Sequence, residues 1–534
     1  MTVSRRDLIK AGLAAGTAFT IPSVLRGQTL PNPAQTVRMV MYANLDIFDP
    51  VYSSAYITAD HALAIYDTLF APDSKFMPQP QMVGKWGVSD DKKTYTFELR
   101  DGLGWHDGAP VTAADCVASI RRWAQVASSG RLIMERASDI SKKDDKTFII
   151  ALKEPLPLLI DMLARIATPC LFIMRERDAG RPATEQVTAN IGSGPFRFNE
   201  ALAKPGASFT YDRNEKYVPR REPPDGLAGG KIVKVERVIW ENITDPQTAF
   251  AALQSREVDF IESTPMDLLS EIKSDPNLEL QVLNKGGYDF YLRVNFLQPP
   301  FDNVKARQAL LHLIDQESFL RVLSPDPKYG HTLTSIFGNE SPYSNSENTG
   351  WYKKGGDPEK AKQLFKEAGY AGEKVLILQA TNIPVFSDGS QLLAAELRKI
   401  GVNAELAPMN TSELSKRRAN KDPIENGGWT IFFSTNSSYA DGDPMSNVAM
   451  VASGDNAYYG WPKDDKYESL RAKWTDAGTL EERKALARRM QEAWWDFVGA
   501  VPVGQVVYPV LHRKTLSGLI GMPSLIPMWN MQKA

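Results

Sequence analysis

Two stretches of the sequence repeat the order strand, helix, strand, which is typical of folds with helices packed on a parallel sheet. In residues 235–263, two apolar runs flank a helix that Asp245 caps and Pro246 begins, as these residue types commonly do. In residues 374–409, a helix with one apolar face separates two more apolar runs and ends at Gly401. A strand that returns to its sheet through a helix runs parallel to the strand before it. Both stretches therefore predict an α/β fold.

An antiparallel element is also indicated. Tyr95, Phe97 and Leu99 alternate with polar residues, which is the pattern of a strand with one buried face. Thr112 and Asp115 then have the spacing of a capping box at the start of a helix. The chain has 534 residues, of which 43% are hydrophobic and 24% charged, and this is enough for two or three domains. We expect a large α/β protein with some antiparallel sheet.

The charge balance and the cysteines exclude several classes of protein. Lys and Arg number 62 against 64 Asp and Glu, and no basic tract occurs, so we expect no nucleic-acid partner. Cys116 and Cys170 lie far apart and lack a metal-binding spacing. We expect two buried free thiols, with a single disulfide as the alternative. The five histidines are scattered, so the sequence predicts neither a metal site nor a cofactor.

The N-terminus has the pattern of a bacterial export signal. Residues 4–10, "SRRDLIK", place two arginines directly before a weakly apolar run, which is the arrangement of a twin-arginine signal. A membrane anchor is the alternative, but the glycines, threonines and proline make this run too polar for a stable span. No cysteine follows it for lipid attachment, and Gly27 and Ala34 are candidate cleavage positions. We expect residues 1–34 to be signal and spacer, and the mature protein to be free in the periplasm.

Catalytic motifs are missing, although one pair of adjacent residues suggests chemistry. The sequence has no GxSxG, phosphate-loop, GxGxxG or HExxH signature in a fitting context. His106 and Asp107 are neighbours in "WHDG", but adjacent side chains on a strand point to opposite faces, and Asp-Gly favours a tight turn. We interpret this stretch as a structural turn between a strand and a helix. The alternatives are a ligand contact and an exported hydrolase that uses His106; an enzyme is not expected.

The stretch that contains this turn, residues 86–116, closely resembles the signature of the periplasmic solute-binding proteins of family 5, which take up dipeptides, oligopeptides and nickel. Seven further segments resemble this family in the family's own order: "FDP" (48–50), "IGSGPFRF" (191–198), "TAFAALQSREVDF" (248–260), "PPFDNVKARQALLHLID" (299–315), "DPEKAKQLFKEAGY" (357–370), "ELRKIGV" (396–402) and "GGWTI" (427–431). Each is weak alone, but together they identify the chain as similar to this family over nearly all of the expected mature protein.

The resemblance implies a particular arrangement of domains. Its members have the two-lobed α/β fold of periplasmic binding proteins (type II, or Venus flytrap), with an extra domain inserted into the first lobe. Matched by motif, lobe I takes residues 35–72, 191–285 and 505–534, the inserted domain takes 73–190, and lobe II takes 286–504. Hinge strands are expected near residues 288–296 and 501–509.

The resemblance also implies a function that involves no chemical reaction. Such a protein is the extracytoplasmic binding component of an ABC importer: it captures a solute between its lobes, closes, and delivers the solute to a permease and ATPase complex in the inner membrane. Ligand binding shifts the equilibrium between open and closed forms. We expect a monomer. A sensor that presents its ligand to a membrane receptor is an alternative that the sequence cannot separate from this function.

The resemblance places ligand contacts at Asn44, Tyr52 and Ser53, at Arg131, at Ser263 and around Trp429. In peptide-binding members, an aspartate three residues after this tryptophan binds the ammonium group of the peptide. Phe432 occupies that position here, and a buried ammonium without a carboxylate costs several kcal/mol. Asp441 and Asp443 are the candidate replacements; a solvent-exposed turn at both is the alternative.

Aromatic residues are frequent after Trp429: Phe432, Phe433, Tyr439, Tyr458, Tyr459 and Trp461. Of these, Phe432, Phe433 and Trp461 are taken as candidate ligand contacts, because a cleft lined by rings favours an apolar, planar or cationic ligand. Packing in a core is the alternative. A peptide is the leading expectation for the ligand, and a non-peptide solute (aromatic, amine, opine or chelated metal) is the alternative.

Overall fold

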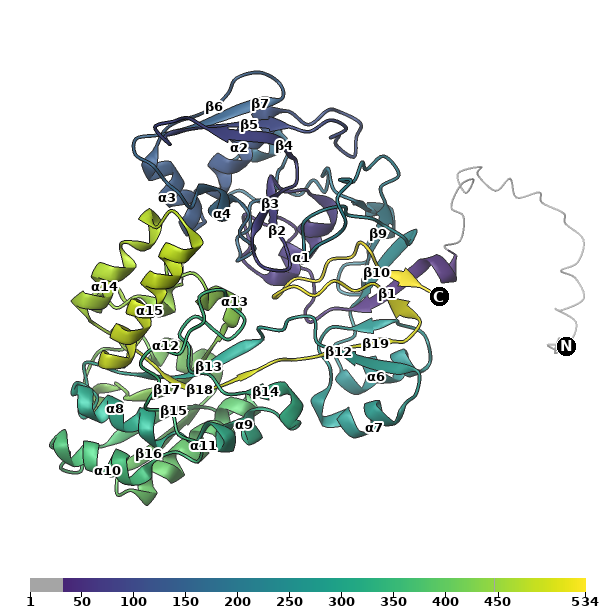
Figure 1. The fold of residues 1–534 in the computed structure, drawn as a ribbon. Helices are drawn as coiled ribbons and strands as arrows, with labels where there is room; N and C mark the ends of the chain where they lie inside the picture. Colours follow the sequence, from purple (N-terminus) through teal and green to yellow (C-terminus); the bar gives the residue numbers. More distant parts are fainter. Residues whose placement is uncertain (1–31, 446) are drawn as a thin grey trace, which may run out of the picture.

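Two large sheets dominate the structure, a computed structural model that describes residues 32–445 and 447–534. We call the part built on the seven-stranded sheet the first lobe, and the part built on the six-stranded sheet the second lobe. A third part, the four-stranded domain, lies above both lobes in Figure 1. The fold therefore has the mixed α/β character that the sequence predicts.

The first lobe contains the first predicted strand–helix–strand unit. The order of its strands is β12 (Leu278–Gln281), β19 (Val510–Arg513), β11 (Phe260–Ile261), β1 (Thr36–Val40), β10 (Arg237–Glu241), β9 (Ser208–Arg213) and β8 (Phe196–Phe198). β1 pairs in parallel with both β10 and β11, and α6 (Pro246–Gln254) connects these two. Asp245 caps α6 by accepting from the Thr248 N–H at 2.7 Å. This prediction is confirmed.

The second lobe contains the other predicted unit. The order of its strands is β14 (Gly330–His331), β18 (Val501–Val506), β13 (Tyr288–Val294), β17 (Ile431–Ser437), β15 (Val375–Ala380) and β16 (Ala404–Met409). β15 and β16 are parallel and are joined by α11 (Pro384–Lys399). Leu393 and Leu397 of α11 are buried, and Gly401 after it has a φ of +89°, so this prediction is also confirmed.

Several further helices belong to the second lobe. They are α8 (Val304–Leu313), α9 (Gln316–Leu323), α10 (Pro358–Glu367), α12 (Thr411–Arg417), α13 (Ser438–Asp441), α14 (Asp465–Arg471) and α15 (Leu480–Phe497). Thr479 and Glu482 form a capping box at the start of α15. Met490 and Trp494 of this helix are buried, so its apolar face anchors it to the lobe.

The four-stranded domain is antiparallel, with the order β4 (Val83–Val88), β5 (Thr94–Leu99), β7 (Thr147–Leu152) and β6 (Ala137–Lys142). Tyr95, Phe97 and Leu99 of β5 are buried as predicted. Thr112 and Asp115 form the predicted capping box of α2 (Ala113–Trp123). The remaining elements are α1 (Tyr56–Ile65), β2 (Phe70–Pro72), β3 (Pro78–Pro80), α3 (Ser128–Arg136), α4 (Leu159–Leu163), α5 (Glu176–Ala179), α7 (Leu269–Ser274), β20 (Leu516–Ser517) and β21 (Gln532–Lys533).

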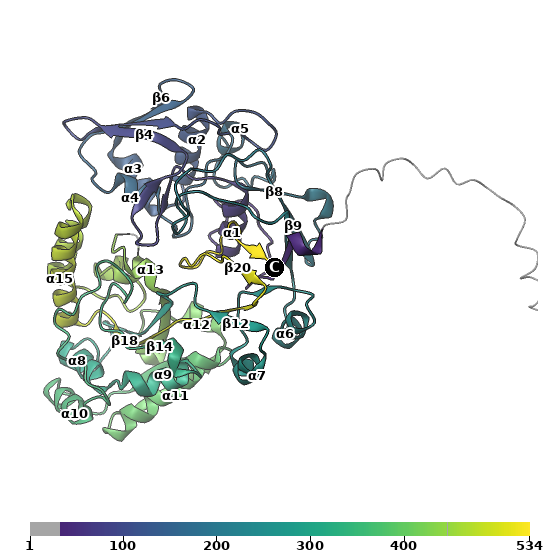
Figure 2. The same ribbon diagram turned by 45° about the vertical axis from the view of Figure 1, so that its right-hand side comes forward.

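The chain passes between the lobes through two connections. Residues 282–287 lead from β12 to β13, and residues 507–509 lead from β18 to β19 (Figures 1 and 2). The rings of Tyr288 and Tyr508 are 5.9 Å apart, so the two connections lie side by side. The hinge is expected near β13 and β18, but both strands lie entirely in the sheet of the second lobe. A hinge would therefore lie in the two connections next to these strands.

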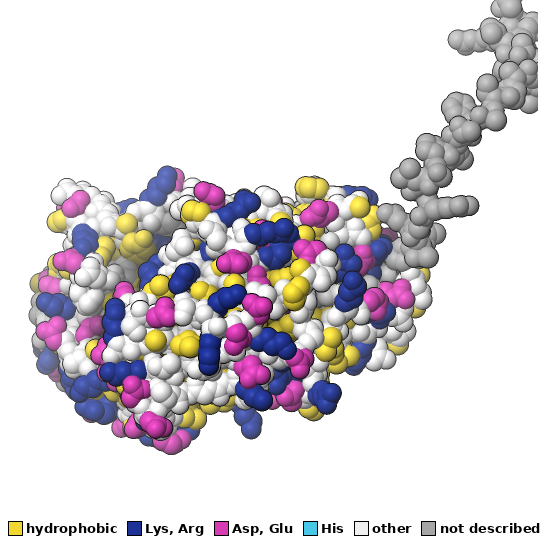
Figure 3. All heavy atoms as spheres, turned by 90° about the horizontal axis from the view of Figure 1, so that it is seen from above, with side chains coloured by type: hydrophobic (Ala, Val, Ile, Leu, Met, Phe, Trp, Pro, Cys, Tyr) yellow, Lys and Arg dark blue, Asp and Glu magenta, His cyan; other side chains and the backbone are white. Residues whose placement is uncertain are grey.

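The surface charges and the two cysteines can be compared with the expectations of no nucleic-acid partner and of two buried free thiols. Lys and Arg side chains are interspersed with Asp and Glu over the face in Figure 3, without a continuous basic area. Cys116 and Cys170 are both buried free thiols, which confirms that expectation. Within the described part of the chain, no helix has the length and hydropathy needed to cross a membrane. The predicted twin-arginine segment lies outside the described residues.

Candidate functional site

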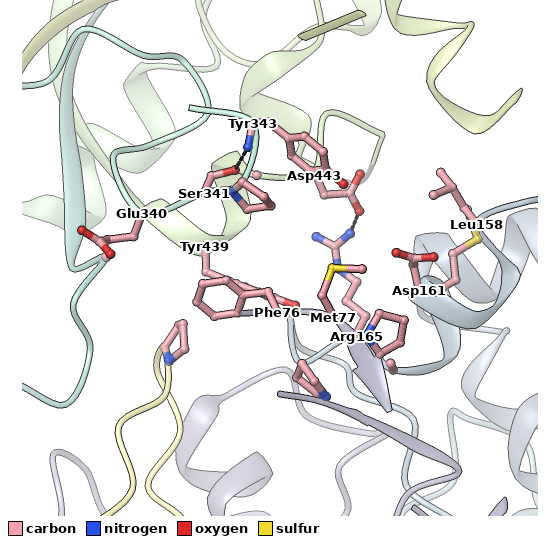
Figure 4. A pocket seen from close by; sticks show the side chains of 18 of the residues that line it. Phe76, Met77, Leu158, Asp161, Arg165, Glu340, Ser341, Tyr343, Tyr439 and Asp443 are labelled. Carbon is pink, nitrogen blue, oxygen red and sulfur yellow. Dashed lines mark hydrogen bonds and ion pairs between the residues drawn. The ribbon is translucent and has the colours of Figure 1, made fainter. Parts of the chain in front are cut away.

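A cavity opens between the second lobe and the segments that face it from the other side of the molecule. Its empty volume, which includes space open to solvent, is about 1040 Å³. We call it the first cavity. The β2–β3 turn contributes Phe76 and Met77, and α4 with its flanking residues contributes Leu158, Asp161 and Arg165. The second lobe contributes Glu340, Ser341, Tyr343, Tyr439, Asp443 and Trp474. Figure 4 shows that the labelled residues come from both sides of the cavity.

Two contacts cross the first cavity. The Arg165 guanidinium forms an ion pair with the Asp443 carboxylate (Figure 4), and these side chains are 11% and 32% exposed. Burial lowers the pKa of Arg165, but an arginine remains charged in proteins. The rings of Phe76 and Tyr439 lie 5.3 Å apart. Each contact joins residues from opposite sides, so both contacts depend on the approach of the two sides.

The first cavity has more acidic than basic groups. Of the described residues that line it, Asp161, Glu340 and Asp443 carry carboxylates, and Arg165 is the one basic residue. Burial raises the pKa of Asp161, and Arg483, whose guanidinium lies 3.8 Å from the carboxylate, opposes this shift. A guanidinium binds a carboxylate well, and a carboxylate binds an ammonium well. The arrangement can therefore hold the two opposite charges of a zwitterion.

Asp441, two residues before Asp443, has different surroundings. It is 1% exposed and accepts hydrogen bonds from the Tyr291 hydroxyl at 3.1 Å and from Asn447 Nδ2 at 2.6 Å. Burial raises the pKa of Asp441 to about 6, and it lies beside the buried Asp289. The alternative of a solvent-exposed turn is therefore wrong for Asp441. It is not among the residues that line the first cavity, whereas Asp443 is.

The aromatic residues around Trp429 pack in the second lobe. Trp429 and Phe432 are fully buried, and Trp461 is 5% exposed. The ring centroid of Trp429 lies 5.0 Å from that of Phe432 and 6.0 Å from that of Trp461. The Trp429 indole N–H donates to the Arg418 carbonyl at 3.1 Å. Phe433 packs against Phe319 on the other face of β17. None of the four lines the first cavity, and their role as ligand contacts stays a prediction.

The other predicted contacts fall into two groups. Ser263 lines a second cavity, which lies beside the connections between the lobes. Asn44, Tyr52, Ser53 and Arg131 are not among the residues that line either cavity. Tyr52 is 47% exposed, and the amide of Asn44 donates to Asp46. The structure thus does not bring the predicted contacts together in one place, and their roles stay predictions.

The "WHDG" stretch forms the predicted turn. The Gly108 N–H donates to the Trp105 carbonyl at 2.8 Å, and Gly108 has a φ of +93°, a conformation that favours glycine. His106 Nδ1 accepts from the Gly192 N–H at 3.2 Å, whereas Asp107 pairs with Arg175 at 3.1 Å. Burial lowers the pKa of His106 to about 4, so this ring is neutral.

His106 and Asp107 therefore have separate partners, and the relay on which the hydrolase alternative depends is not formed. Among the described residues, no group of three or more His, Cys, Asp or Glu side chains could hold a metal ion. The geometry around the turn serves to connect β5, α2 and the Gly192 segment, rather than to perform chemistry.

Of the residues that line the first cavity, the sequence analysis singles out Tyr439 and Asp443; Phe76, Met77, Asp161 and Arg165 are among those that it misses. For two of them the sequence does contain a signal. Asp161 and Arg165 interrupt the apolar run "LLIDMLARIA" with a spacing of four, which places both on one side of a helical turn. Phe76 and Met77 lie in a turn between two short strands, and no local pattern marks them.

Comparison with known proteins places the chain among binding proteins. The family model described as "Bacterial extracellular solute-binding proteins, family 5 Middle" matches residues 77–459. The "probable peptide ABC transporter periplasmic-binding protein y4tO" of Sinorhizobium fredii (strain NBRC 101917 / NGR234) is 63% identical over 100% of both chains.

Two solved structures are similar in fold. The ABC transporter substrate-binding protein CtaP from Listeria monocytogenes has a TM-score of 0.79 at 20% identity, over 93% of this chain and 99% of that one. The dipeptide-binding protein from Pseudoalteromonas sp. SM9913, in complex with Met-Leu, has a TM-score of 0.70 at 19% identity, over 94% and 100%. This likeness confirms the two-lobed α/β fold of periplasmic binding proteins. With a family match over most of its length, the chain belongs to family 5 of the bacterial extracellular solute-binding proteins.

Proposed function

We propose that the chain captures a peptide or peptide-like solute in the first cavity and delivers it to a membrane permease and ATPase complex of an ABC importer. The observation that carries this proposal is the ion pair of Arg165 with Asp443 across a cavity between two separate parts of the molecule. The name of the relative from Sinorhizobium fredii and the Met-Leu complex of the Pseudoalteromonas protein also favour a peptide.

The charges of the first cavity suit the two ends of a short peptide. Arg165 is the partner for the terminal carboxylate, and Asp443 or Asp161 is the partner for the terminal ammonium. In this arrangement Asp443, which follows α13, binds the peptide ammonium group. The resemblance assigns this role to an aspartate at the position that Phe432 occupies here. Ligand contacts to both sides stabilise the closed form, which the permease recognises. The solute leaves unchanged, because no bond is made or broken.

A thermal-shift screen tests this proposal. Protein that has been unfolded, dialysed and refolded to remove any bound solute is mixed with dipeptides and tripeptides. A ligand that binds only the folded state stabilises it by about 2.7 kcal/mol at one hundred times its Kd, and calorimetry then gives the affinity. The absence of any shift with peptides contradicts a peptide as ligand. A shift with an opine, an aromatic acid, a free amine or a chelated metal instead supports the non-peptide alternative.

Location and domain boundaries are part of the same proposal. The protein acts in the periplasm as a monomer, after export by the twin-arginine route. The sequence-based domains are lobe I (35–72, 191–285, 505–534), the inserted domain (73–190) and lobe II (286–504). We move the boundary at 505 to 507, because all of β18 (Val501–Val506) pairs in the sheet of the second lobe. Replacing Arg5 and Arg6 by Lys in the full chain should stop export, which cell fractionation measures. Export of this variant at the normal rate would contradict the twin-arginine route.

A further inference from the structure

The second cavity lies where strand ends, α1 and both interlobe connections meet. Its empty volume, which includes open solvent, is about 1180 Å³. Its lining includes Tyr42, which follows β1, and Glu262, which follows β11. β1 and β11 are parallel neighbours, and ligands commonly bind at the carboxyl ends of parallel strands. The connections contribute Tyr288 and Tyr508.

Two carboxylates lie close to each other here, and one of them lines the cavity. Glu262 lines it, and one of its oxygens accepts from the Tyr42 N–H at 2.9 Å. Asp60 lies behind it on α1 and is 1% exposed; its Oδ1 accepts from the Ile526 N–H at 2.8 Å, while its Oδ2 has no hydrogen-bond partner. Burial raises the pKa of both groups, that of Glu262 to about 7, and their mutual repulsion raises the pKa of Asp60 further. A positive charge at this place would relieve the repulsion.

Among the residues that the structure describes, the lining of the second cavity includes neither Lys nor Arg, in contrast to the first cavity with Arg165. Buried carboxylates in proteins are ordinarily paired with a cation or another donor. Glu262, which lines the cavity, and the unpartnered Oδ2 of the nearby Asp60, whose Oδ1 accepts from the lining residue Ile526, therefore mark a place for a cationic group from outside the chain.

The aromatic side chains that line the second cavity suit the apolar stem of a cationic side chain. Tyr42, Tyr56, Tyr288 and Tyr508 line the cavity, and the rings of the last two lie 5.9 Å apart. Tyr56 lies one helical turn before Asp60 on α1, so both project from one side of the helix. Aromatic faces attract an ammonium or guanidinium group and also pack against its apolar stem.

We propose that the second cavity binds the positively charged end of a side chain of the solute, so that the protein selects peptides or peptide-like solutes with a lysine-like or arginine-like group. This inference rests on the proposed function, because it assumes that a peptide-like solute occupies the neighbouring first cavity. It adds a charge preference that the fold and the family do not specify.

The test uses tripeptides that differ in one charge. Ala-Lys-Ala and Ala-norleucine-Ala share the same four-carbon side chain, to which lysine adds the terminal ammonium group. Their Kd values are measured by calorimetry on the ligand-free, mature protein. We expect the lysine peptide to bind at least about tenfold more tightly, as charge-assisted hydrogen bonds require. In the Glu262→Gln variant the ratio of the two Kd values should fall at least about threefold, and in the double variant Glu262→Gln with Asp60→Asn it should approach one.

Two controls keep the test decisive. Glu271→Gln, an exposed position on α7 of the same lobe, should retain the full preference. Circular dichroism and the melting temperature establish that Glu262→Gln is folded; if it is not, Asp60→Asn replaces it with the same expectation. Equal binding of both peptides to the unchanged protein overturns the charge preference and leaves the proposed function intact. Binding of neither peptide overturns both.

The pH dependence gives an independent readout. Because the pKa of Glu262 is about 7, the carboxylate gains charge as the pH rises from about 6 to 8, and the lysine peptide should bind more tightly over this range. The groups that face Glu262 are Asp60 on α1 and the neutral phenols of Tyr42 and Tyr288, whose pKa values burial raises. A lysine peptide whose affinity changes no more with pH than that of the norleucine peptide contradicts the assignment.

Discussion

Two neighbouring segments of the second lobe, residues 429–433 and 439–443, differ in what surrounds them. The first contains the family's tryptophan and is sealed among apolar side chains of the lobe. The second follows β17 and presents Tyr439 and Asp443 to the first cavity. The strand supplies a rigid support, and α13 with the residues after it supplies the side chains that face the cavity. The segment that carries the motif is therefore not the part that faces the cavity.

The largest effect is expected for the sealed segment. Replacing Trp429 by Ala leaves a cavity in the core and should lower the free energy of unfolding by about 3–5 kcal/mol. The Kd of the peptide for the folded fraction should not change. Urea unfolding and calorimetry measure the two quantities. The control is Trp86→Ala, since Trp86 is 46% exposed. If Trp429→Ala instead weakened peptide binding strongly and left the free energy of unfolding unchanged, the first segment would contact the ligand, and the two segments would not differ in role.

Asp441 lies within the second segment but is 1% exposed and does not line the first cavity, so its pH dependence sharpens the comparison. Its pKa is raised from 3.8 to about 6 in the folded protein, so the folded state binds a proton more tightly than the unfolded state. The free energy of unfolding therefore falls as the pH rises from about 4 to 6, by up to about 3 kcal/mol.

The Asp441→Asn variant isolates this contribution, because other buried acids of the protein also titrate. Asn keeps an acceptor for the amide of Asn447 and can also bond the Tyr291 hydroxyl. We expect the stability of the variant to rise relative to the unchanged protein between pH 4 and 6. Urea unfolding at several pH values measures this, and parallel curves for the two proteins would contradict the assignment to Asp441.

Substitutions of the residues that line the first cavity should change the Kd of the peptide rather than the free energy of unfolding. Arg165→Met removes the partner of Asp443 and the proposed partner of the peptide carboxylate, and should raise the Kd about tenfold or more. Arg131→Met is the matched control, because Arg131 is exposed on α3 although the resemblance places a ligand contact there. Calorimetry with one dipeptide compares them. If Arg131→Met has the larger effect, the sequence-based site is correct and the first cavity is not the site.

A smaller effect is expected for the aromatic contact across the first cavity. Phe76→Leu removes a ring pair with Tyr439 that contributes about 0.5–1.5 kcal/mol, so the Kd should rise about two- to tenfold. Phe433→Leu, in the sealed segment, changes a ring of similar size but should leave the Kd unchanged and lower the melting temperature. Equal changes in Kd for the two variants would show that the segments do not differ in function.

The secondary structure was predictable because its signals are local. The cap at Asp245, the capping box at Thr112 and the alternation around Phe97 each depend on residues within one turn or one strand. The site was less predictable, because Arg165 and Asp443 meet only through the three-dimensional packing of segments that are far apart in sequence. Asp443 was a candidate because Phe432 occupies the position where the resemblance expects an aspartate. Its partner Arg165 is marked only as a polar residue in the run "LLIDMLARIA", which does not indicate what it pairs with.

The two connections between the lobes, at residues 282–287 and 507–509, have a kinetic consequence. When two bodies rotate about an axis, atoms near the axis move least. The second cavity has Tyr288 and Tyr508 from beside these connections in its wall, so its shape should change little as the lobes open. The pair of Arg165 with Asp443 joins opposite sides and must separate. The second cavity would thus already be formed when the lobes are open, whereas the contacts across the first cavity would form only on closure and would set the residence time of the solute.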